Sequence, residues 1–199
     1  MAAPSYTTDL NTVSLADSLT GWAELSGHTS GGAATLEGDY FIHNANCVSQ
    51  SFGQKTGTAA GLQYTHGSNL GTGWTTGHVF LFWQVCLAGN AMDTYAQGGT
   101  RLGVGSTAGN MNFWTSGGSD FGRNPYGGWQ NIAIDPQNTA DFTDGTPVAG
   151  NYTVFGSTIN LVSQVSKGNM HGVDAIRYGR AEIIVEHGDL ANGYATAAG

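Results

Sequence analysis

GHVFLFWQVCLAG, residues 77–89, is the longest apolar run in the chain. The eleven residues between its two glycines include several aromatic and β-branched side chains, and they contain no charge and no proline. At this length, such a composition favours a strand buried on both faces over a helix. The run is too short for a membrane span, which needs about 20 apolar residues. We therefore expect a central strand of a sheet that is covered by a second layer.

Glycine is frequent throughout the rest of the chain. The 199 residues include 32 glycines and only 4 prolines, and 11% of them are aromatic. Short segments rich in Val, Ile, Thr and aromatic residues alternate with clusters of Gly, Ser and Asn, a pattern that predicts many short strands joined by turns. The expected strands are 21–25, 33–37, 40–44, 46–52, 60–65, 77–88, 100–105, 111–116, 128–134, 151–156, 172–178 and 181–187. Residues 12–19 are the nearest candidate for a short helix, and 138–142 for a single helical turn.

These segments predict an all-β fold, an antiparallel β-sandwich of jelly-roll type. Nothing in the composition marks a second domain, so we expect one β-sandwich domain over residues 1–190 and a tail of small residues over 191–199. The alternation of polar and apolar residues over 173–180 predicts an edge strand or an outer sheet for that segment.

Charge limits the possible partners. Charged residues make up 10% of the chain and the net charge is −8, with six Lys and Arg in all. A nucleic-acid backbone is held mainly by cationic side chains, so nucleic-acid binding is not expected. The N-terminus has no cationic region followed by an apolar core, so no signal peptide is predicted. Cys47 and Cys86 lie in apolar segments, and two buried reduced thiols are the simplest interpretation, with a disulfide as the alternative.

Two groups of acidic residues are candidates for chemistry. Glu37 and Asp39 lie two residues apart and could form the carboxylate pair of a glycosidase. Gly38 between them also allows a plain turn. The segment 135–144 is the densest cluster of oxygen ligands. Turns and helix caps account for these residue types, so no cofactor is expected, and calcium is the alternative that the cluster leaves open. The candidate calcium ligands are Asp135, Asn138, Asp141 and Asp144.

Four aromatic residues border glycine-rich loops. Exposed rings there could stack on sugar faces or pack against another subunit, although packing within the chain is the default for such side chains. These candidates for a carbohydrate site or a subunit interface are Trp74, Trp114, Phe121 and Tyr126.

Three stretches resemble a known family. GDYFIHNANCVSQSF (38–52), PYGGWQNIAIDP (125–136) and SKGNMHGVDAIRYGR (166–180) are similar to segments of a family of phage structural proteins. The N-terminal part of that family is similar to a concanavalin A-like lectin/glucanase jelly roll. The resemblance extends over about residues 20–190.

The resemblance implies a non-enzymatic virion protein, such as a capsid decoration, a fibre or a tail-associated protein. It further implies a location on the outer surface of the virion, contacts with a major capsid or tail protein, and assembly as a homotrimer. The first alternative is a glycan-binding, lectin-like module for attachment to host or environmental polysaccharide. The second is a glycoside hydrolase.

Overall fold

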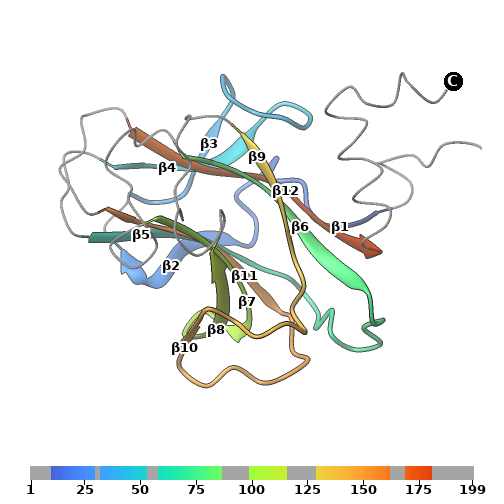
Figure 1. The fold of residues 1–199 in the computed structure, drawn as a ribbon. Helices are drawn as coiled ribbons and strands as arrows, with labels where there is room; N and C mark the ends of the chain where they lie inside the picture. The colour runs from blue at the N-terminus through green and yellow to red at the C-terminus, as the bar shows by residue number, and fades with distance from the viewer. Residues whose placement is uncertain are drawn as a thin grey trace, which may run out of the picture.

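The computed structural model describes residues 10–29, 32–52, 58–86, 99–115, 129–161 and 169–180. Within these ranges the regular elements are strands, and they form two six-stranded antiparallel sheets packed face to face (Figure 1). The predicted all-β sandwich of jelly-roll type is therefore confirmed. No helix in these ranges is long and apolar enough to cross a membrane.

The first sheet, called sheet A, has the strand order β3-β4-β12-β6-β9, and β1 pairs with β12 outside this path. Strand β12 is twice as long as β4, so its two halves pair with different strands: the first half with β4 and the second with β1. The members of sheet A are β1 (Asn11–Ser14), β3 (Thr35–Glu37), β4 (Cys47–Phe52), β6 (His78–Cys86), β9 (Gln130–Ile134) and β12 (Asn169–Arg180).

The second sheet, called sheet B, has the order β10-β8-β7-β11-β5-β2. Its members are β2 (Trp22–Thr29), β5 (Thr58–Thr65), β7 (Gly99–Thr107), β8 (Asn110–Thr115), β10 (Phe142–Asp144) and β11 (Val154–Leu161). A glycine is required on β7, because a Cβ at Gly103 would lie 2.4 Å from the Phe113 ring on β8. Glycine at this position leaves room for the phenylalanine ring.

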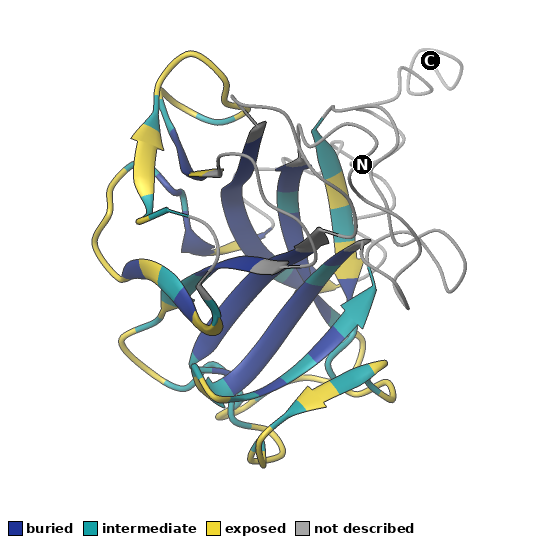
Figure 2. Cartoon of the chain, turned by 90° about the vertical axis from the view of Figure 1, so that its left-hand side faces the viewer, coloured by how far each residue is buried: buried dark blue, intermediate teal, exposed yellow. Residues whose placement is uncertain are grey.

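The opening apolar run forms β6, an interior strand between β12 and β9. Both of its faces are buried: Phe80 and Phe82 are fully enclosed, and Leu81, on the opposite face, is 2% exposed. The predicted strand with two covered faces is confirmed. Figure 2 shows the buried strands of the sandwich in contrast to the exposed loops at its margins.

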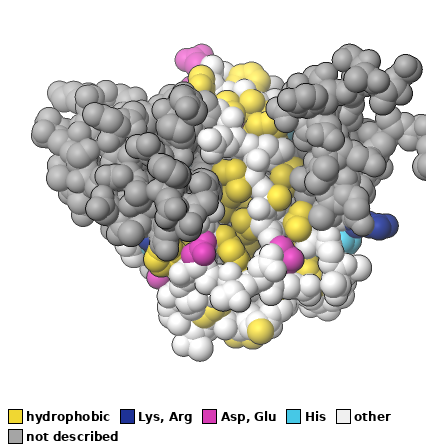
Figure 3. All heavy atoms as spheres, viewed as in Figure 1, with side chains coloured by type: hydrophobic (Ala, Val, Ile, Leu, Met, Phe, Trp, Pro, Cys, Tyr) yellow, Lys and Arg dark blue, Asp and Glu magenta, His cyan; other side chains and the backbone are white. Residues whose placement is uncertain are grey.

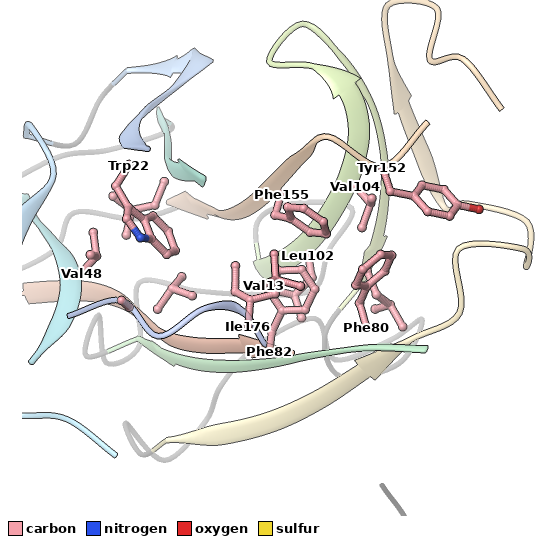
Figure 4. Packing of buried hydrophobic residues seen from close by; sticks show 14 residues of the cluster. Val13, Trp22, Val48, Phe80, Phe82, Leu102, Val104, Tyr152, Phe155 and Ile176 are labelled. Carbon is pink, nitrogen blue, oxygen red and sulfur yellow. The ribbon is translucent and has the colours of Figure 1, made fainter. Parts of the chain in front are cut away.

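The main core lies between the sheets. Sheet A contributes Phe80, Phe82 and Ile176, and sheet B contributes Leu102 and Phe155. Aromatic rings interlock across the interface, with the centroids of Phe80 and Phe155 4.9 Å apart in an edge-to-face arrangement. Figure 4 shows this cluster, with Tyr152 at one end and its hydroxyl directed away from the other side chains.

Several sequence-based predictions of local structure were wrong. Residues 11–14 form β1 instead of starting a helix, because the second half of β12 offers an edge for pairing. Residues 142–144 form β10 beside β8. The segment 173–180 belongs to an interior strand, where Asp174 and Arg177 are buried at 0% and 5% exposure.

Residues 40–44 form a loop instead of a strand, and a buried carboxylate explains why. Asp174 Oδ2 accepts hydrogen bonds from the backbone N–H groups of Ile42 and His43, at 2.6 and 2.8 Å, so these groups are not available for a strand ladder. The predicted strand at 181–187 and the predicted tail at 191–199 lie outside the described residues. The single domain over 1–190 stays a prediction.

Candidate functional site

A cavity of about 340 Å³ lies beside β7 and β8, under the chain that follows β9 and the chain that precedes β11. Its volume is within the range of small-molecule sites. The lining residues are Val104, Gly105, Asn112, Trp114, Pro136, Gln137, Pro147, Val148, Ala149, Gly150, Asn151 and Tyr152.

Trp114, one of the four aromatic candidates, is a half-buried wall of this cavity. It lies on β8 opposite Leu102, and its indole packs against the main core. The indole Nε1–H donates to the carbonyl oxygen of Thr139 at 3.2 Å, which fixes the plane of the ring. Trp114 is thus held in one orientation by packing on one side and a hydrogen bond on the other.

The connection from β9 to β10 is held by its own acidic residues. Asp135 Oδ1 accepts from the backbone N–H of Gln137 at 2.9 Å, in a local turn. Asp141 Oδ2 accepts from both the backbone N–H and the hydroxyl of Thr115, at 2.8 and 3.0 Å. The Asp135 turn contains Pro136 and Gln137, which line the cavity, and Asp141 ties the same connection to β8.

The same contacts bear on the calcium candidates. Asp135 accepts a hydrogen bond within its own turn, and Asp141 accepts from Thr115 of β8. Asn138 is exposed, with its backbone N–H bonded to the Asp135 carbonyl, and Asp144 lies in β10 opposite Met111. Among the described residues, no group of three or more His, Cys, Asp or Glu side chains could hold a metal ion. Calcium at this segment stays the untested alternative to turn chemistry, and titration of the metal would test it.

The opposite wall, residues 147–152, is fastened to the loop that precedes β6. Asn69 Oδ1 accepts from the backbone N–H groups of Tyr152 and Gly71, both at 2.8 Å. The two loops touch so closely that a Cβ at Gly71 would lie 1.7 Å from the carbonyl oxygen of Gly150. Only glycine at position 71 allows this approach.

Tyr152 joins the cavity to the core. Its ring packs edge-to-face on Phe80, with centroids 5.5 Å apart, and on Trp74, with centroids 5.1 Å apart. Burial raises the pKa of its hydroxyl above the ordinary value, and the negative charge of Asp135 raises it further. The hydroxyl therefore stays protonated at neutral pH and can donate a hydrogen bond.

Three amide side chains complete the lining: Asn112, Gln137 and Asn151. Asn112 Oδ1 accepts from the hydroxyl of Thr143 at 2.9 Å, and Asn151 Oδ1 accepts from the hydroxyl of Thr153 at 2.6 Å. Within the described ranges these two amides bond only through their oxygens, so their Nδ2 groups remain as donors. The cavity combines an indole, a phenol and several neutral hydrogen-bonding groups.

The other aromatic candidates are placed differently. Trp74 is partly buried and stacks on Phe80 with ring centroids 4.6 Å apart, so it supports the site from the core side of Tyr152. Phe121 and Tyr126 lie outside the described residues. Sequence reasoning missed Tyr152 and the three amides, because only the fold brings β8, 136–137 and 147–152 together.

The structure also places the predicted carboxylate pair, Glu37 and Asp39, and the thiol of Cys47. Glu37 Oε1 accepts from the backbone N–H of Asp39 at 2.8 Å, so the two acids form a turn after β3. Cys47 is a free, fully buried thiol, as the sequence predicted, and burial raises its pKa to about 12. The side chain of Cys86 lies outside the described residues.

A second aromatic group lies on the outer face of sheet A, where residues of the loop 38–46 contact Trp83 and Trp129. The ring of Tyr40 stacks on Trp129, with centroids 6.0 Å apart and an interplanar angle of 21°. His43 packs edge-on against Trp83 of β6. Tyr40, Phe41 and Ile42 are each about 40% exposed.

Comparison with known proteins identifies the fold. No known protein family matches the chain, and no curated protein is significantly similar to it in sequence. Among solved structures, it is similar to a family 11 carbohydrate-binding module from Clostridium thermocellum in complex with a β-1,3-1,4-mixed-linked tetrasaccharide. The TM-score is 0.54 and the identity 14%, over 87% of this chain and 96% of that one.

Two further structures share the fold. A carbohydrate-binding module specific for non-crystalline cellulose, CBM28, gives a TM-score of 0.52 at 16% identity, over 86% of this chain and 97% of that one. An exo-β-agarase gives 0.53 at 12% identity, over 87% of this chain but only 25% of the enzyme. At these identities the similarity concerns the fold.

The predicted relationship to phage virion proteins is wrong. No family match supports it, and the solved structures to which the chain is similar include carbohydrate-binding modules and a segment of an agarase. The described parts of the three stretches that suggested it, 38–52, 129–136 and 169–180, belong to a β-sandwich, a fold that proteins of unrelated function share. The role as capsid decoration or fibre is withdrawn with it, and the trimer stays a prediction.

Proposed function

We propose that the chain is a non-catalytic module that binds carbohydrate in the Trp114 cavity. The observation that carries the proposal is the composition of that cavity: one indole and one phenol beside three neutral amides. A sugar ring has an apolar face of C–H groups and a rim of hydroxyls. An aromatic ring can pack on the face while amides bond to the rim.

The fold supports this assignment, because the solved structures that share it include two modules named for carbohydrate binding. Glycan binding was the first alternative derived from the sequence, and Trp114 was one of its candidate residues. Trp114, a candidate from the sequence, therefore lies in the wall of the cavity that the structure shows.

Catalysis is not part of the proposal. A glycosidase of the usual kind needs two carboxyl groups at the scissile bond, and none of the twelve cavity-lining residues is an Asp or a Glu. The pair suggested by the sequence, Glu37 and Asp39, forms a turn after β3 instead of lining the cavity.

Affinity electrophoresis tests the proposal. The protein is run in native gels that contain mixed-linkage β-1,3-1,4-glucan, hydroxyethylcellulose, xylan or β-1,4-galactan, together with a non-binding reference protein. We expect retardation by at least one of these polysaccharides and no release of reducing ends.

The Trp114→Ala variant should lose the retardation, and Trp114→Phe should retain part of it because the aromatic face is kept. Leu19→Ala, which removes a 43% exposed apolar side chain in the β1–β2 turn, is the matched control and should behave as wild type. Free migration of the wild-type protein in all four gels would overturn the proposal, as would unchanged binding by Trp114→Ala.

A further inference from the structure

We infer that the Trp114 cavity is one end of an extended site, in which a linear, uncharged polysaccharide lies along β9, the last strand of sheet A within the described residues, and reaches the Tyr40–Trp129 ring pair. This inference rests on the proposed function and specifies its ligand. The inference depends on what flanks β9 in the sequence. Trp129 directly precedes the strand, and Pro136 and Gln137, which line the cavity, follow within three residues of its end.

The spacing suits a polymer. At about 3.3 Å per residue, the stretch from 129 to 135 spans roughly 20 Å, which is several sugar rings. Within the described residues β9 pairs only with β6, and Asn131 and Ala133 between the two ends are exposed. A band of hydrophobic side chains runs down the middle of the face shown in Figure 3, on the side where β9 lies in Figure 1.

The Tyr40 loop is built to hold its rings in place. Besides the two hydrogen bonds to Asp174, the Sγ–H of Cys47 donates to the carbonyl oxygen of Tyr40 at 3.1 Å, and Asn44 Nδ2 donates to Asp17 Oδ2 at 2.5 Å. A loop fixed at four points displays three consecutive apolar side chains to solvent. Preorganisation of this kind lowers the entropic cost of binding, and exposed apolar side chains of this size mark contact surfaces.

Charge selects the class of polysaccharide. The segments 38–46 and 129–137 and the cavity lining contain no Lys or Arg, and they include Asp39 and Asp135. The charge of Asp135 already acts on Tyr152 at the cavity. A polyanion such as a uronate or sulfated chain would be repelled, whereas the hydroxyls of an uncharged chain can donate to these carboxylates.

Calorimetry with a length series of mixed-linkage or 1,4-linked gluco-oligosaccharides, from disaccharide to hexasaccharide, tests the inference. We expect affinity to increase up to at least the tetrasaccharide and to change little with salt. Trp129→Ala and Tyr40→Ala should weaken hexasaccharide binding by about three- to tenfold and leave disaccharide binding unchanged. Leu19→Ala should change neither, and thermal melts confirm that each variant is folded.

The failure of this inference differs from failure of the proposed function. If Trp114→Ala abolishes binding but the hexasaccharide binds no more tightly than the disaccharide, or the Tyr40 and Trp129 variants bind it as wild type does, the extended site is overturned and the cavity remains. Tighter binding of carboxymethylcellulose than of hydroxyethylcellulose would overturn the preference for an uncharged chain. If no oligosaccharide binds and no polysaccharide retards the protein, both proposals are wrong.

Discussion

The two ends of the sandwich interior are held together in different ways. At the end near the cavity, called the aromatic end, the rings of Phe80, Phe155, Tyr152 and Trp74 pack against one another. At the other, polar end, hydrogen bonds join the sheets. Gln84 Nε2 of sheet A donates to Ser157 Oγ of sheet B at 2.6 Å, and the same hydroxyl lies 2.7 Å from Nε2 of His171.

Because ring packing and hydrogen bonds differ in how strictly they fix geometry, the two ends contribute differently to the fold. Ring packing tolerates small adjustments, and it forms a solid support for the cavity walls. Hydrogen bonds are directional, so the polar end fixes how one sheet is placed on the other. Gln50 adds to this, because its Nε2 donates across the interface to the carbonyl oxygen of Gly61 at 3.0 Å.

The largest effect should come from the aromatic end. Phe155→Ala removes a fully buried ring that contacts both Phe80 and Phe82. We expect the free energy of unfolding to fall by about 3–5 kcal/mol, measured by urea denaturation. Leu19→Ala should cost less than 0.5 kcal/mol, as is roughly typical of exposed sites. A loss for Phe155→Ala no greater than that of the control would show that the rings do not hold the sheets together.

Ser157→Ala tests the polar end. The change removes the buried hydroxyl that bonds to both Gln84 Nε2 and His171 Nε2, so we expect a loss of about 1–3 kcal/mol in the same assay. Ser51→Ala, at an exposed position of β4, is the control. Equal stability of the two variants would mean that the hydrogen bonds between the sheets add nothing.

The polar end should also make stability depend on pH. Burial lowers the pKa of His171 from 6.5 to about 3. Between these two pH values the imidazole is protonated in the unfolded chain and neutral in the folded protein. Stability from this group is complete above pH 6.5 and falls with decreasing pH by roughly 1.4 kcal/mol per unit down to about pH 3. The difference between wild type and His171→Gln isolates the effect from other groups; parallel pH profiles would contradict it.

The smallest expected loss of stability concerns the support of the cavity. Asn69→Ala removes the acceptor for the backbone N–H groups of Tyr152 and Gly71, and we expect a loss of about 1 kcal/mol together with weaker retardation in affinity gels. Asn69→Asp keeps an acceptor oxygen and should retain binding. If Asn69→Ala binds as tightly as wild type, the wall at 147–152 does not need this fastening.

The sequence predicted the fold better than the site. Periodicity and glycine spacing were enough to identify the sandwich and the buried strand β6, because these depend on local patterns. The position of β12 was misjudged, since its alternating polar residues suggested an edge. Asp174 is in fact buried under the loop 38–46, whose backbone N–H groups it accepts. Such a contact between residues 131 and 132 positions apart leaves no local signal in the sequence.

The cavity shows the same limit. Trp114 could be singled out because it borders a glycine-rich loop, whereas Tyr152, in the chain before β11, resembles any core aromatic residue. Its role depends on Asn69 and Gly71, which fasten its loop from a distant part of the sequence. The predicted relationship to phage proteins was wrong, and a β-sandwich fold alone does not decide between such functions.

Fluorine NMR on protein labelled with 5-fluorotryptophan tests the central claim most directly. The chain has five tryptophans, each assignable by a Trp→Phe variant, and they report separately on the core and the cavity. On titration with a polysaccharide that retards the protein, the Trp114 resonance should shift most, and that of the buried Trp22 should stay unchanged. A titration in which binding occurs but Trp114 does not respond would contradict the assignment of the carbohydrate site.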